Sequence, residues 1–215
     1  VGLRFLRGTQ PSLEAQLCNL ADEIAYNAHD IDDGVRSGLI TLEQLQDVPL
    51  FEGFRQQALG THPKLAAPEQ TRRLLYESIR LMLSAQVYDV IDATRAALAL
   101  HALADVDAVR RAPPLVMFGE VMRERSQELK QFLFKNLYRH PRVMETTARA
   151  QEVVRDLFAA YIESPHEMNA GFAEQAAAAD AAPVRARAVA DFIAGMTDRF
   201  AMREHERLTG RRSFD

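Results

Sequence analysis

Cysteine is nearly absent from this chain, and its scarcity limits how the fold is held together. The single residue, Cys18, excludes an internal disulfide bond and fits a reducing compartment, so we expect a cytoplasmic protein. Apolar neighbours in a helical pattern predict that Cys18 is a buried small hydrophobe rather than a nucleophile. Apolar runs stay well short of the roughly 20 residues that a membrane-spanning helix needs, so we expect no membrane partner.

Alternating runs of β-branched residues, which are typical of strands, are scarce as well. Alanine, leucine, arginine and glutamate dominate instead and favour helices, so the sequence predicts an all-α fold. Hydrophobic residues make up 47% of the 215 positions, which is enough for a sizeable core. The net charge of −4 lacks the basic excess that indicates general attraction to nucleic acid, so nucleic acid is not indicated as a partner.

Residues that start and stop helices divide the chain into expected elements. Ser12 is predicted to cap a helix that ends near Gly34 or Gly38, and Thr41 is predicted to cap the next one. Further helices are expected at residues 49–59, 68–100, 119–139, 141–161 and 185–208, with a loop at 105–114. Histidines outside the motifs described below, including His205, are expected at the surface.

An acidic ridge within the first helix is the most informative feature of the sequence. Asp22, Tyr26 and Asp30 are four residues apart, so a helix places them on one face, with His29 beside them. Apolar residues are interleaved with this ridge, which indicates a helix packed on most sides that presents acid to a cleft. Because buried carboxylates need a cation or hydrogen-bond donors, the pattern predicts a metal or sugar site.

Three separated segments carry a resemblance to a known family: LADEIAYNAHDIDDG at 20–34, preceded by SLEAQ from Ser12, then FLFKNLYRHPRV at 132–143 and DFIAGMTDRFA at 191–201. In this order they resemble the bacterial deoxyguanosinetriphosphate triphosphohydrolase-like family, which are dNTP triphosphohydrolases of the HD superfamily. The resemblance covers nearly the whole chain. It implies a parent enzyme that hydrolyses a deoxynucleoside triphosphate to the deoxynucleoside and inorganic triphosphate, and a homo-oligomeric assembly.

The same resemblance implies a multi-helix bundle of the HD type. Residues 1–215 are expected to form a single helical unit, in which about 12–60 complete the HD core and about 68–215 form the C-terminal helical region. The family's first metal ligands, a histidine and an adjacent His-Asp pair, have no counterpart here. His29-Asp30 does not replace that pair, because it follows Asp22 in the chain.

Roles for individual residues also follow from the resemblance. Asp22 corresponds to the family's final aspartate ligand of a divalent metal ion, Mg²⁺ or Mn²⁺. Tyr26 and Asp30 are expected to face the deoxyribose, with Asp30 accepting a hydrogen bond from the 3′-hydroxyl. Contacts to the triphosphate are expected from Lys135, Tyr138 and Arg139, since clustered cationic side chains form charge-assisted bonds with phosphate. No residue of this chain is assigned a catalytic role.

Two alternatives from other classes stay open on the sequence. We expect the chain to be the C-terminal half of such an enzyme, with Val1 beginning a fragment, and to bind metal poorly and hydrolyse nothing on its own. It is alternatively a non-enzymatic helical module for oligomerisation or regulation. A third interpretation, an all-α enzyme that uses diphosphates, requires a second acidic cluster that the sequence does not contain.

Overall fold

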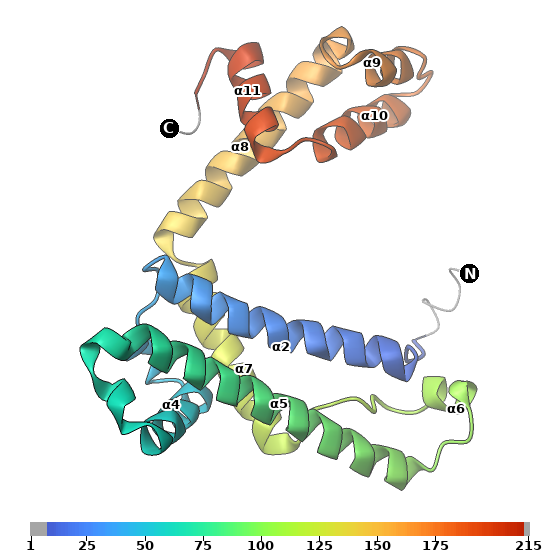
Figure 1. Ribbon diagram of the computed structural model, residues 1–215. Helices are drawn as coiled ribbons and strands as arrows, with labels where there is room; N and C mark the ends of the chain where they lie inside the picture. Colours follow the sequence, from blue (N-terminus) through green and yellow to red (C-terminus); the bar gives the residue numbers. More distant parts are fainter. Residues whose placement is uncertain (1–7, 213–215) are drawn as a thin grey trace. The chain divides into compact units, whose positions relative to one another are not determined.

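The computed structural model describes residues 8–212, and every regular element in that range is a helix (Figure 1). The predicted all-α class is therefore confirmed. Contacts divide the chain into two compact units, residues 8–140 and 141–212, and each is described by itself. The boundary between the units follows His140, whereas the sequence placed a subdivision near residues 60–68. None of the helices in the described range is long and apolar enough to cross a membrane.

The first unit begins with the helix that carries the acidic ridge. Helix α2 (Leu13–Arg36) starts directly after Ser12 and passes without a break through the aspartates, as predicted, but the Ser12 side chain makes no capping hydrogen bond. Thr41 caps α3 (Leu42–Leu45) through a reciprocal pair of hydrogen bonds with Gln44. The next elements are α4 (Pro49–Thr61), two short 3₁₀ turns, η1 (Pro63–Ala66) and η2 (Pro68–Gln70), and the long α5 (Thr71–His101).

The core of the first unit lies where α2, α4, α5 and α7 (Glu120–Leu133) meet. Fully buried side chains come from each part: Ile31 from α2, Phe51 from α4, Met82 from α5 and Leu129 from α7. Each such side chain contributes about 2 kcal/mol through removal of its apolar surface from water. This packing fixes α2 and α7 relative to each other and so determines what can lie between them.

Two polar anchors hold the segment that leads into α7. The Gln16 side chain, on α2, accepts hydrogen bonds from the backbone N–H groups of Leu115 at 2.9 Å and Val116 at 3.2 Å. The Asp89 carboxylate, on α5, accepts from the Gly119 N–H at 2.7 Å. Upstream of this segment, the prediction of a loop at 105–114 is wrong in part, because residues within that range form the short helix α6 (Val106–Arg111).

A π-helical turn, η3 (Phe134–Tyr138), continues α7 directly. The Arg139 N–H donates to the Phe134 carbonyl at 3.0 Å, five residues back, which is the wide spacing of a π turn. The single helix expected at 119–139 is therefore continuous in space, but its last turn is wider than the α-helical spacing assumed from the sequence.

The second unit begins with α8 (Pro141–Glu163), which starts at Pro141 as predicted. It continues through a short 3₁₀ turn, η4 (Pro165–Glu167), and then α9 (Ala170–Ala177), α10 (Ala182–Ala194) and α11 (Asp198–Thr209). The single final helix expected at 185–208 is wrong, because the helix ends before Gly195 and Thr197 caps a new one. Helices α10 and α11 both pack against α8, around the fully buried Tyr161.

Two further expectations about burial are also wrong. Cys18 is exposed on the outer side of α2, because the buried positions of that helix follow another face. His205 is 1% exposed and lies 2.9 Å from the Asp156 carboxylate, so it is an internal partner of α8 and not a surface residue. The sequence neighbours of His205 are charged, which hid its inward position.

Candidate functional site

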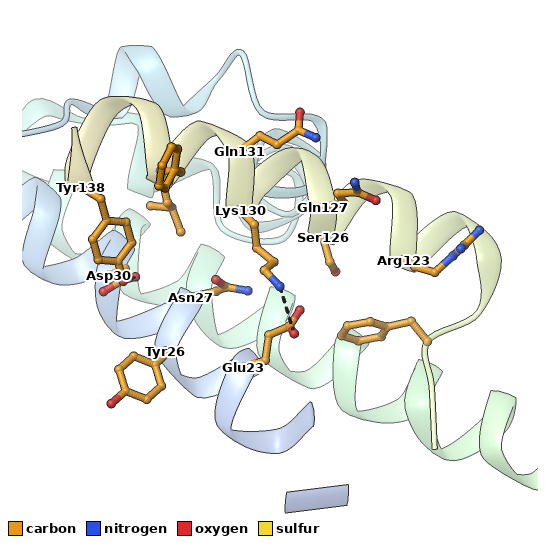
Figure 2. A pocket seen from close by; sticks show the side chains of 13 residues that line it. Glu23, Tyr26, Asn27, Asp30, Arg123, Ser126, Gln127, Lys130, Gln131 and Tyr138 are labelled. Atoms are coloured by element: carbon orange, nitrogen blue, oxygen red, sulfur yellow. Dashed lines mark hydrogen bonds and ion pairs between the residues drawn. The ribbon is translucent and has the colours of Figure 1, made fainter. Parts of the chain in front are cut away.

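A pocket of about 730 Å³ lies in the first unit between α2 and the continuous α7–η3 segment (Figure 2). The α2 wall includes Tyr26 and Asp30, and the facing wall includes Lys130 and Tyr138. Four charged side chains line it, the carboxylates of Glu23 and Asp30 and the cations of Arg123 and Lys130, so their formal charges cancel. The remaining polar lining residues are Asn27, Ser126, Gln127 and Gln131.

Asp30 and Tyr138 meet directly at one end of the pocket. The Tyr138 hydroxyl donates a hydrogen bond of 2.5 Å to the Asp30 carboxylate across 108 residues of sequence. This hydrogen bond and partial burial raise the pKa of Tyr138 to about 12, so the hydroxyl stays protonated and remains a donor at neutral pH. The structure thus brings together two residues that the sequence analysis selected from separate segments.

Tyr26 and Asp22 lie at different distances from this pocket. Tyr26 lines it but is 60% exposed, one turn before Asp30 on the same face of α2. Asp22, one turn earlier, is exposed and is not part of the lining. In residues 8–212, no group of three or more His, Cys, Asp or Glu side chains is arranged to hold a metal ion. Asp22 alone does not form a metal site, and its assignment as a ligand stays a prediction.

The cations that line the pocket, Arg123 and Lys130, are not those selected from the sequence. Lys135 and Arg139 are exposed and do not line the pocket, and the Arg139 guanidinium lies 5.0 Å from the centre of the Phe134 ring. Lys130 lines it instead, and its ammonium lies 3.1 Å from the Glu23 carboxylate (Figure 2). This ion pair bridges α2 and α7, as the Tyr138–Asp30 hydrogen bond bridges α2 and η3.

Buried polar side chains underlie the pocket near this ion pair. Asn27 is 7% exposed, and its Nδ2 has no hydrogen-bond partner in the described part of the chain. Ser126, on α7, is 2% exposed and accepts a 3.2 Å hydrogen bond from Gln86 Nε2, on α5. Such burial without full hydrogen bonding costs free energy, about 1–3 kcal/mol for a typical group.

The sequence contained a signal for these missed residues. Counting back from Tyr138 in steps of four gives Phe134, Lys130 and Ser126, and all of them line the pocket. Equal spacing of this kind marks one face of a helix. Lys135 and Arg139 were predicted instead, because they cluster with Tyr138 in a segment that carries the family resemblance.

Part of the chain is similar to a known family of domains. Residues 116–207 match the family described as the phosphohydrolase-associated domain, which includes α7, η3 and most of the second unit. These residues are therefore similar to a domain that is associated with phosphohydrolases.

More specific relatives carry the name deoxyguanosinetriphosphate triphosphohydrolase-like protein. One from Bordetella pertussis is 50% identical over 97% of this chain and 52% of its own length. Relatives from Ralstonia nicotianae and Nitrosomonas europaea are 50% and 41% identical, again over 97% of this chain. The resemblance inferred from the sequence is thereby confirmed, and this chain is related to that family. It spans about half the length of the relatives it matches.

Proposed function

We propose that residues 8–140 form one wall of the substrate site of a deoxynucleoside triphosphate triphosphohydrolase. The protein that contains the whole site would release inorganic triphosphate and a deoxynucleoside. The single observation that carries this proposal is the Tyr138–Asp30 hydrogen bond in a pocket between α2 and α7. It unites two of the segments on which the family resemblance rests, in a hollow large enough for a nucleoside.

The sugar is bound at the Asp30 end of the pocket. Tyr138 uses one carboxylate oxygen of Asp30, which leaves the other oxygen to accept the 3′-hydroxyl of a deoxyribose. Holding the carboxylate by a neutral donor fixes its orientation without cancelling its charge, so it stays a strong acceptor. Tyr26, exposed on the same face one turn away, covers the sugar with its ring.

The triphosphate is bound by cations, of which Lys130 is the first. In the free chain the Lys130 ammonium is paired with Glu23, and an arriving polyanion competes for it. Lys135 and Arg139 stay in this proposal as outer contacts, because both are exposed near η3. Asp22 contributes one carboxylate ligand to a divalent metal, Mg²⁺ or Mn²⁺, whose other ligands come from protein outside residues 8–212.

Triphosphate release tests this function directly. The 215-residue chain is compared with the same chain joined to the part of the Bordetella pertussis relative that it does not match. We expect no release from the chain alone and turnover from the joined protein, reduced at least about tenfold by Asp30→Asn. Asn19→Leu, an exposed change on α2 outside the pocket, is the matched control and should leave turnover unchanged.

Two results would reject the proposal. Robust release by the 215-residue chain alone would show that its site is complete and different from the one described. A folded joined protein without turnover on any of the four deoxynucleoside triphosphates would instead favour the non-enzymatic helical module.

A further inference from the structure

A second pocket of the first unit is lined by different residues from those of the α2–α7 pocket. It has a volume of about 290 Å³ and lies where the C-terminal end of α2 meets the N-terminal end of α5 (Figure 1). Three charged side chains line it, those of Asp32, Arg36 and Arg72, and most of the remaining lining is apolar. Pockets for drug-sized ligands span roughly 300–1,000 Å³, so this one suits a smaller molecule.

The apolar part of this pocket is continuous with the core of the first unit. Leu75, on α5, is 4% exposed and belongs to that core, and Val35 and Leu42 are half-buried against it. The Tyr76 ring, which is 40% exposed, completes the apolar lining. Such a lining favours an aliphatic or aromatic group, because contact removes apolar surface of both partners from water.

Arg72 is the cation of this pocket, and its partner is a phenol rather than a carboxylate. Its Nε and Nη2 groups donate to the Tyr76 hydroxyl at 3.2 Å and 3.1 Å, and its guanidinium lies 5.4 Å from the centre of the same ring. Among residues 8–212, Arg72 forms no ion pair with a carboxylate. A guanidinium has five N–H donors in a plane, so Arg72 keeps several that suit a ligand carboxylate.

Asp32 supplies the opposite charge on the α2 side of the pocket. Its carboxylate is half-buried and makes no hydrogen bond or ion pair with another residue in the described part of the chain. The hydrogen bond to Tyr76 raises the pKa of Arg72, and the charge of Asp32 adds a smaller contribution, so the two charges are near without touching. Arg36 is already paired with Asp33 at 3.0 Å. One anion and one cation therefore line the pocket without contacting each other.

A ligand that carries both charges pairs with both side chains at once. A simple carboxylate would bind Arg72 but bring a second negative charge near Asp32, and a simple amine would do the reverse. We propose that this pocket binds an α-amino acid with an apolar side chain, whose carboxylate meets Arg72 and whose ammonium meets Asp32. Both contacts are charge-assisted, and the side chain of the amino acid covers Leu42 and Leu75. The proposal does not depend on the nucleotide site, because the two pockets have different lining residues.

Four small molecules test the proposal on the 215-residue chain. L-leucine carries both charges and an apolar side chain, 4-methylpentanoate lacks the ammonium, 3-methylbutylamine lacks the carboxylate, and glycine lacks the side chain. Dissociation constants come from NMR titration at constant ionic strength, and shifts of the backbone amide signals locate the site. We expect L-leucine to bind about fivefold more tightly than each of the other three, since each lost interaction is partly exposed to water.

Two substitutions separate the charges of the site. In Asp32→Asn, the affinity of L-leucine should fall about fivefold while that of 4-methylpentanoate does not fall, because only an ammonium uses Asp32. In Arg72→Gln, both carboxylate ligands should bind more weakly, and 3-methylbutylamine should not. A purely structural role of either side chain would weaken all of these ligands alike. Asp92→Asn and Arg95→Gln, at exposed positions of α5 outside the pocket, are the matched controls and should leave each dissociation constant unchanged.

The results that would overturn the proposal are distinct from one another. Equal binding of L-leucine, 4-methylpentanoate and 3-methylbutylamine would show an apolar pocket that does not read charge. Equal binding of L-leucine and 4-methylpentanoate that depends on Arg72 would show a simple anion site. If L-leucine does not bind at millimolar concentration, or shifts only amides around the α2–α7 pocket, the site is rejected. None of these results decides whether the joined protein releases triphosphate, so the proposed function is tested separately.

Discussion

The hydrogen bond between Tyr138 and Asp30 makes the most direct prediction from this structure. Tyr138→Phe removes the hydroxyl that donates at 2.5 Å to the Asp30 carboxylate and leaves the ring in place. The change should loosen the attachment of η3 to α2, because this bond joins the two elements at the end of the pocket. It should also weaken deoxynucleoside binding, since the Asp30 carboxylate loses the group that orients it.

The size of the effect follows from burial. A hydrogen bond to a charged group contributes about 1.5–3 kcal/mol when it is protected from water. Tyr138 is 46% exposed, so water replaces much of the lost bond, and we expect about 1 kcal/mol. The same reasoning predicts a loss of deoxynucleoside affinity of about fivefold, the equivalent of that free energy.

A double-mutant cycle isolates this interaction from other effects of the substitutions. Tyr138→Phe and Asp30→Asn are made singly and together, and the opening free energy of α2 is measured by native-state hydrogen exchange. We expect a coupling free energy of about 0.5–1 kcal/mol. Tyr88→Phe, at an exposed tyrosine on α5, is paired with Asp30→Asn as the control and should show no coupling. Additive effects of Tyr138→Phe and Asp30→Asn would refute the contact.

Three other predictions concern packing, pH and charge. Gly34→Ala should destabilise the first unit by about 1–3 kcal/mol in urea denaturation, because the added Cβ would lie 2.8 Å from the buried Ile40 side chain. The hydrogen bond to His205 lowers the pKa of Asp156. The stability that the ionised Asp156 carboxylate gives the second unit is therefore present above about pH 4 and is lost as the pH falls. Asp156→Asn should remove this acid sensitivity from thermal denaturation curves measured between pH 3 and 6. Lys130→Met should raise the KM for a deoxynucleoside triphosphate in the joined protein while deoxynucleoside affinity changes less than about twofold.

Local rules predicted the starts of several helices because those starts depend on nearby residues. Thr41 caps α3 through its side chain and Pro141 begins α8 with its fixed backbone angle, whereas Ser12 precedes α2 without a side-chain capping hydrogen bond. The break before α11 escaped the same rules. Thr197 caps that helix, but the apolar spacing on either side of it continues across the break and favoured one uninterrupted helix.

Burial of polar residues could not be predicted, because it depends on partners distant in sequence. His205 lies among charged neighbours but is buried, and its ring nitrogen lies 2.9 Å from the carboxylate of Asp156, 49 residues away. Gln16 is likewise buried by backbone donors about 100 residues later. Cys18 is the reverse case, since apolar neighbours suggested burial and the helix turns it outward. A periodic pattern identifies a face but not the element that covers it.

The cation of the candidate site shows where spacing was more informative than closeness in sequence. Lys135 and Arg139 flank Tyr138 in sequence, yet a helix directs neighbouring side chains toward different faces, and neither of them lines the pocket. Lys130 lies eight residues before Tyr138, and both residues line it. Tyr138 lies in the π turn that follows Phe134, and it still lines the pocket and bonds to Asp30. Exchanging Lys130 should therefore affect the pocket more than exchanging either neighbour of Tyr138.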